Sequence, residues 1–247
     1  MKGCVTLALA ACLGLGGLLA QGPQWKSQEE IDAFMKVQGA AGLQERADAA
    51  REFMASFPDS EAVGLAAYMA MLSYQQLNDF ENMLLYGDMV LANNPEPGMM
   101  AGTLISLATA IPTRTREFDL DKEEKLSKAE DYAKKAMGLI PQLGKMDPNM
   151  SDDEWLATKM DFMSQCHEAL GGVFAKREQY DQAEASLRKA VEMAQQPVPF
   201  TLFNLADVLS KQGKKEEAAA FADQCVARGG VQAADGTDLC ARLKAQL

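Results

Sequence analysis

A repeat with a period of 35 residues most constrains what this chain can fold into. The segment 170–174 (Leu-Gly-x-x-Phe) matches the segment 205–209 (Leu-Ala-x-x-Leu), and small or apolar residues downstream keep the same offset. These further pairs are Ala183 with Ala218, Leu187 with Ala222, Ala190 with Cys225, and Val191 with Val226. Each unit is patterned as a helix, a short turn and a second helix. Such units stack side by side, because none can bury its apolar face alone.

The spacing of these residues resembles the tetratricopeptide repeat family. Residues 164–197 match its pattern with Leu170, Gly171, Phe174, Tyr180, Ala183, Leu187 and Ala190, and residues 199–230 match with Leu202, Leu205, Ala206, Gly213 and Ala218. Residues 64–95 match with Tyr74, Asn78-Asp79-Phe80, Val90 and Pro95, and weaker units cover 27–58 (Ala47, Ala50, Phe53) and 98–141 (Ala129, Ala133, Ala136). The resemblance implies an all-α, right-handed superhelical solenoid of helix-turn-helix repeats over residues 27–234. A generic helical bundle with coincidental spacing is the alternative.

Three departures from the repeat are expected. The first helix of the middle unit should run from Gly98 to Ile111 and stop at Pro112, followed by a charged loop inserted at 113–125. Ser151 and Glu154 form a capping-box pattern, which predicts a long helix over 152–176 whose first turns use Trp155, Leu156, Phe162 and Met163 as their apolar face. Residues 235–247 are predicted to form a helix that caps the last repeat.

The first twenty residues have the pattern of a secretory signal peptide, with Lys2, a long apolar stretch and a small residue at Ala20. We expect cleavage after Ala20, a short linker at 21–26 and a periplasmic mature protein. A retained membrane anchor and a lipidated Cys12 are the alternatives. No later stretch of eighteen apolar residues exists, so the mature chain should not insert stably in a membrane.

Composition excludes several function classes. The formal charge of −11 and the pI of about 4.7 disfavour nucleic acid as a partner. His167 is the only histidine, and neither a nucleophile-elbow nor a P-loop motif occurs. Carboxylates such as Glu216 and Glu217 fall on polar helix faces, so we expect no enzyme activity and no cofactor.

Three cysteines remain after export: Cys166, Cys225 and Cys240. A disulfide between Cys225 and Cys240 would hold the capping helix in an oxidising compartment, whereas three small buried side chains are the alternative. His167 is expected to be buried and hydrogen-bonded. The fourteen methionines of the mature chain suggest a second function, a periplasmic copper or redox accessory protein using Met and a free Cys, although methionine is more often core filler.

The resemblance implies a function as well as a fold. In this family the first helices of the repeats line a concave groove that holds a partner protein or peptide. The groove residues expected here are Leu65, Tyr68, Met69, Leu72, Gln75, Gln165, Glu168, Ala169, Gly172, Lys176, Phe200, Phe203, Asn204, Asp207 and Lys211. Phe200 and Phe203 would be aromatic anchors, or would instead pack under the capping helix. The expected function is an exported, non-enzymatic protein-binding scaffold or adaptor of the bacterial cell envelope.

Overall fold

A computed structural model describes residues 22–247 of the chain. The predicted signal peptide, its predicted cleavage after Ala20 and the alternative at Cys12 lie outside the described residues. Within them there are eleven α-helices, one short 3-10 helix (η1, Ile140–Gln142) and no β-strand beyond an isolated bridge between Gln232 and Asp238. The α-helices are α1 (Gln28–Gly39), α2 (Leu43–Ser56), α3 (Val63–Gln76), α4 (Phe80–Ala92), α5 (Pro97–Arg114), α6 (Lys122–Leu139), α7 (Asp152–Lys176), α8 (Tyr180–Met193), α9 (Pro199–Lys211), α10 (Lys215–Ala227) and α11 (Leu239–Gln246).

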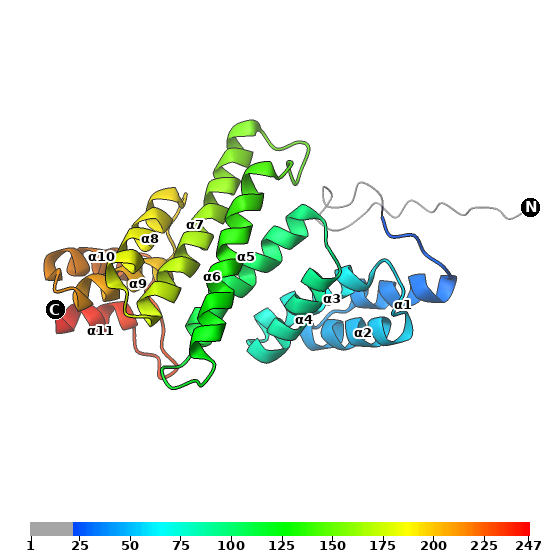
Figure 1. Cartoon of the computed structure of the whole chain (residues 1–247), viewed down its shortest axis with the longest axis horizontal. Coiled ribbons are helices and arrows are strands. Elements are labelled where there is room, and N and C mark those ends of the chain that lie inside the picture. The colour runs from blue at the N-terminus through cyan, green and yellow to red at the C-terminus, as the bar shows by residue number, and fades with distance from the viewer. Residues whose placement is uncertain (1–21) are drawn as a thin grey trace, which may run out of the picture.

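The helices form an elongated array of hairpins. Each helix from α1 to α10 packs on the next one in the chain, and α11 packs on α9 and α10. Figure 1 shows the array running from α1 at one end to α11 at the other. The all-α fold predicted from the repeat is therefore confirmed.

Small residues allow the two helices of a hairpin to approach closely. Ala183 and Ala218, which are equivalent in the 35-residue repeat, are both fully buried in the same apolar cluster. A Cβ atom added to Gly171 would lie only 2.5 Å from the Cγ atom of Leu187. Leu187 therefore occupies the space that the missing side chain leaves.

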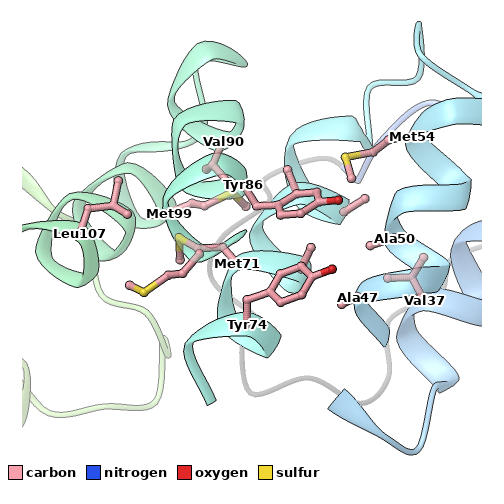
Figure 2. Close-up of a cluster of buried hydrophobic side chains, with 14 of the residues drawn as sticks. Val37, Ala47, Ala50, Met54, Met71, Tyr74, Tyr86, Val90, Met99 and Leu107 are labelled. Carbon is pink, nitrogen blue, oxygen red and sulfur yellow. The ribbon is translucent and has the colours of Figure 1, made fainter. Parts of the chain in front are cut away.

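The apolar core runs continuously through the first half of the array. Figure 2 shows Tyr74 of α3 and Tyr86 of α4 between the side chains of α1 and α2 and those that lead to Leu107 of α5. The two tyrosine rings stack with their centroids 5.3 Å apart. The same buried cluster continues to Leu126 of α6 and Val173 of α7, so neighbouring hairpins share one core.

Three turns between the first and second helices of a hairpin have the same geometry. Each places one residue at positive φ: Asn78 (61°), Glu178 (60°) and Gly213 (77°). The residue after each of them donates its backbone N–H to a carbonyl five positions back, as Asp79 does to Tyr74 at 2.9 Å. The repeat is therefore a repeat of backbone geometry as well as of apolar residues.

The middle hairpin differs from its sequence-based prediction. The helix expected to stop at Pro112 continues to Arg114, and the loop expected at 113–125 spans only residues 115–121. Proline in the last turn removes a single helical hydrogen bond, while Thr115 still donates its N–H to Ile111 at 2.9 Å. At the other end of the loop, Glu123 and Glu124 occupy the first turn of α6, where negative charge stabilises a helix.

The long α7 was predicted with its correct bounds. Its capping box is present, with the Ser151 hydroxyl accepting the Glu154 N–H and the Glu154 side chain accepting the Ser151 N–H. Trp155 is buried and donates its indole N–H to the Leu143 carbonyl at 3.3 Å. Leu156, expected on the same apolar face, is instead exposed.

Both ends of the described chain are fastened to the array. Residues 22–26, expected as a linker, lie against the first hairpin, where the Trp25 and Phe34 rings are 5.2 Å apart and Lys26 Nζ bonds the Asp59 carbonyl. The C-terminal helix begins at Leu239, four residues later than predicted, because the Asp238 side chain caps it by accepting the Cys240 N–H. A disulfide joins Cys225 to Cys240, whose Cα atoms are 6.0 Å apart.

Candidate functional site

The first helices of successive hairpins meet along one row: α3, α5, α7 and α9. A Cβ atom on Gly102 of α5 would lie 3.4 Å from the hydroxyl oxygen of Tyr68 on α3, and one on Gly172 of α7 would lie 3.3 Å from Pro112 of α5. On α9, the buried Thr201 donates its hydroxyl to the carboxylate of Glu168 on α7. We call the partly exposed side of these four helices the first-helix face.

Small polar residues of α5 form the middle of this face. Gly102, Ser106 and Thr109 are half-buried, and Thr113 is exposed. The hydroxyls of Thr109 and Thr113 bond carbonyls of their own helix, at 2.9 and 2.6 Å. Small side chains therefore line the α5 part of the face, and the Tyr68 hydroxyl lies over Gly102. Sequence reasoning missed these four residues, although their helical spacing, with all four on one side, is a signal that could have found them.

Most of the side chains predicted on α3 pack against the apolar core and are only half-exposed to solvent. Tyr68, Met69, Leu72 and Leu65 are half-buried and contact the first-half core, while Gln75 is exposed. Burial raises the pKa of the Tyr68 phenol above its usual value, so this hydroxyl remains a hydrogen-bond donor at neutral pH.

The residues predicted on α7 differ in their surroundings. Gln165 is exposed, Gly172 contacts Pro112, and Ala169 is buried at 2% exposure, so its assignment to the groove was wrong. Ala169 is part of the apolar cluster that includes residues of α5 and α6. Lys176 donates from Nζ to the Thr115 carbonyl at 2.8 Å, which ties the 115–121 loop to α7.

Glu168 is a half-buried carboxylate on the α7 part of the face. Burial raises the pKa of its carboxyl group above the ordinary value, while the bond from the Thr201 hydroxyl acts in the opposite direction. A partly buried carboxylate without an ion-pair partner among the described residues could receive a donor or a positive charge from a bound segment.

The residues predicted on α9 are at the face and at its edges. Phe200 and Asn204 are half-buried on the face. Asp207 and Lys211 form an ion pair at 2.7 Å, and the Lys211 ammonium lies 5.9 Å from the centre of the Tyr180 ring. These two charges therefore neutralise each other at the edge of the face.

Phe203 belongs to the capping region. It contacts the buried cluster of Leu202, Cys225 and Cys240 and the cluster that contains Leu243 of α11. Of the two interpretations of Phe203, packing under the capping helix is the one the structure shows, and its assignment as a groove anchor was wrong. The reason is that α11 needs an apolar surface on α9 to pack against.

The 115–121 loop presents two large apolar side chains that sequence reasoning did not select. Phe118 is 93% exposed, and Leu120 is fully exposed. A shallow depression next to this loop is lined by Glu117, Lys122, Lys176 and Arg177, among other residues. Arg177 is paired with Glu123 and Glu130, each at 2.5 Å, and so holds α6 against α7.

The side chains that a copper or redox function would use are partly inside the protein, although Met35 and Met160 are exposed. Met71, Met83 and Met99 are buried core residues. Cys166 is buried, and its burial raises the pKa of the thiol to about 12, so it is protonated at neutral pH. Within residues 22–247 no group of three His, Cys, Asp or Glu side chains is arranged to hold a metal ion.

His167 is buried, as expected, but not fully hydrogen-bonded. Its Nδ1 atom has no partner among the described residues. Burial, with a smaller effect from Lys189, lowers the pKa of its imidazole. The side chain is therefore neutral at pH 7 and contributes to packing between helices.

The fold and the first-helix face define a class: a helical-repeat protein built from stacked hairpins. Within that class, the tetratricopeptide repeat family model matches residues 164–197 and 201–228, so these two segments are similar to repeats of this family. No curated protein sequence matches the chain. None of the helices in residues 22–247 combines the length and apolarity needed to cross a membrane.

Two solved structures align with most of this chain. A thermophilic TPR protein of Thermus thermophilus aligns over 88% of this chain and 97% of its own, with 18% identity and a TM-score of 0.50. An assembly chaperone of RpL4 aligns over 88% of this chain and 94% of its own, with 12% identity and a TM-score of 0.42. The first likeness supports the hairpin-array fold.

Proposed function

We propose that the protein is an exported, non-enzymatic scaffold of the bacterial cell envelope that binds a segment of a partner protein along its first-helix face. Tetratricopeptide repeats generally mediate binding between proteins, which supports the class of function. The cell-envelope location rests on the signal-like pattern of residues 1–20. A disulfide between Cys225 and Cys240 agrees with that location, because such bonds persist in oxidising compartments.

The observation that carries the proposal is the chemistry of the first-helix face. Its centre on α5 carries four small residues at helical spacing: Gly102, Ser106, Thr109 and Thr113. On either side, α3 contributes Tyr68 and Leu72, and α7 contributes Gln165. Tyr68 lies over Gly102, but the short side chains of Ser106, Thr109 and Thr113 would let an extended or helical segment contact three helices at once. Half-buried aromatic and aliphatic side chains can then supply apolar contact, and exposed amides can supply hydrogen bonds.

The test is crosslinking and affinity capture from the native envelope fraction with two charge-bearing variants. Gln75→Arg with Gln165→Arg changes two exposed amides on the first-helix face. Gln182→Arg with Gln224→Arg makes the same chemical change on second helices, α8 and α10, where both side chains are also exposed. We expect the first variant to lose at least tenfold of the captured partner and the second to retain it. Equal capture by both variants would remove the face from the proposal.

Export is tested separately. The mature protein should be found in the periplasmic fraction, and its amino-terminal residue should be Gln21. A protein that keeps residues 1–20 and sediments with membranes would instead support the anchored alternative. A fatty-acylated Cys12 would support the lipoprotein alternative. Both outcomes leave partner binding on the first-helix face unaffected.

A further inference from the structure

Only one of the two oxygens of the Glu168 carboxylate is hydrogen-bonded within the described part of the chain. Oε2 accepts the hydroxyl of Thr201, which is buried near the start of α9. Oε1 has no hydrogen-bond partner among residues 22–247, and it is not one of the fully buried atoms that lack a partner. Oε1 therefore reaches solvent where α7 and α9 meet on the first-helix face.

No cation in the part of the chain that the structure describes neutralises this carboxylate. Burial raises the pKa of the Glu168 carboxyl group and the Thr201 bond lowers it, and no charged side chain contributes to the shift. On the same face, Lys211 pairs with Asp207 at 2.7 Å. Lys176, about two turns further along α7, donates to a backbone carbonyl at 2.8 Å. The negative charge of Glu168 is therefore left for a bound segment to meet.

We propose that the first-helix face binds a segment that carries a lysine or arginine, and that the cation of this side chain pairs with Oε1 of Glu168. Since this pairing names the chemistry of the segment bound at the first-helix face, it rests on the proposed function. Lysine and arginine have long aliphatic stems, so the cation can reach a half-buried carboxylate while the backbone of the segment stays at the surface.

A cation fits Glu168 better than a neutral donor does. Burial removes part of the water around this carboxylate, and the Thr201 hydroxyl replaces only one of its hydrogen bonds. A hydrogen bond between two charged groups is stronger than one from a neutral donor, and a poorly solvated site strengthens it further. The formal charge of the chain, −11, also favours the approach of a basic segment over that of an acidic one.

The first test uses a phage-displayed library of random peptides about twelve residues long, which span roughly 40 Å when extended. The library is panned on the chain without residues 1–20. Peptides bound at the first-helix face are those that no longer bind the variant with Gln75→Arg and Gln165→Arg. We expect these peptides to share a lysine or arginine at one aligned position.

Two outcomes of the panning contradict the pairing, and they differ in what else they remove. Face-binding peptides without a shared basic residue overturn the pairing and leave the proposed function standing. A library in which no peptide depends on the face overturns both the pairing and the binding site of the proposed function.

The second test is a double-mutant cycle that assigns the basic residue to Glu168. Glu168→Gln should weaken the parent peptide at least about tenfold, the lower end of what a hydrogen bond to a charged group contributes. The same variant should bind as well as the unchanged protein does to a peptide whose lysine or arginine is replaced by glutamine. Circular dichroism verifies that Glu168→Gln is folded.

Glu192→Gln is the matched control for the cycle. It removes the same charge from an exposed position on α8, the second helix of the same hairpin. We expect this variant to bind the parent peptide as the unchanged protein does. Equal weakening by Glu168→Gln and Glu192→Gln would mean that only the net charge attracts the peptide, and would overturn the pairing. Replacement of the peptide's basic residue with the same effect in Glu168→Gln as in the unchanged protein also overturns it.

Discussion

At the residue scale, the repeated turns place three different side chains in one backbone conformation. Asn78, Glu178 and Gly213 all have φ near +60 to +80°, a region that costs a side-chain-bearing residue about 1–2 kcal/mol. We therefore predict that Glu178→Gly stabilises the protein by about 0.5–1 kcal/mol. This is the backbone strain that the substitution releases, minus the larger conformational entropy that glycine loses on folding. Urea denaturation measures the change.

The equivalent position in the next repeat provides the control. Gly213 already has the favoured residue, and a Cβ atom added there would meet nothing within 4 Å. Gly213→Glu should therefore destabilise through backbone strain alone, by about 1 kcal/mol. If Glu178→Gly proves neutral while Gly213→Glu destabilises, contacts of the Glu178 side chain offset the strain at that turn.

A second residue-scale prediction concerns Glu168. Because burial raises the pKa of its carboxyl group in the folded state, the protein binds this proton more tightly when folded than when unfolded. The contribution of protonated Glu168 to the free energy of unfolding is therefore fully present below the ordinary glutamate pKa. This contribution is lost as the pH rises through the folded-state pKa. Glu168→Gln should raise the melting temperature at pH 7, and the difference should disappear near pH 4. A constant difference across this range would assign the effect to the Thr201 hydrogen bond instead.

At the element scale, the approach of α7 and α8 depends on the missing side chain of Gly171. A Cβ atom there would lie 2.5 Å from Leu187 Cγ, so Gly171→Ala forces the two helices apart. We expect a loss of about 1–3 kcal/mol, typical of overpacking. Gly138→Ala is the matched control, since a Cβ atom on that residue of α6 meets nothing within 4 Å and alanine is the better helix former. Thermal denaturation of both variants should give changes of opposite sign.

The elements also show which sequence signals carry structural information. The Ser151–Glu154 capping box predicted the start of α7, because a cap satisfies backbone groups locally and needs no knowledge of the fold. Pro112 misled the prediction of α5, because the penalty of a proline depends on how much helix follows it. Here only two helical residues follow, and the ring packs against Gly172 of another hairpin. Contacts between hairpins cannot be predicted from the sequence of a single segment.

The same distinction applies to the candidate site. Tyr68 and Gln165 were correctly placed on first helices, because the repeat register fixes which residues of a first helix face the same way, while their part in binding stays a prediction. The α5 residues were missed because the middle unit is a weak match and its small side chains resemble packing residues. Phe203 was misassigned because the register is the same in every unit, while only the last first helix must also accommodate a capping helix.

At the scale of the whole molecule, stability should be local. Each hairpin contacts its neighbours in the chain, and α11 contacts α9 and α10 at one end of the array. Replacing both bonded cysteines (Cys225→Ser with Cys240→Ser) opens a loop with a sequence separation of 15, which costs about 3 kcal/mol by loop entropy. Because coupling in a solenoid acts between nearest neighbours, hydrogen exchange should accelerate in α9–α11 and remain unchanged in α1–α4. Equal acceleration at both ends would mean instead that the continuous core makes the array unfold as one cooperative unit.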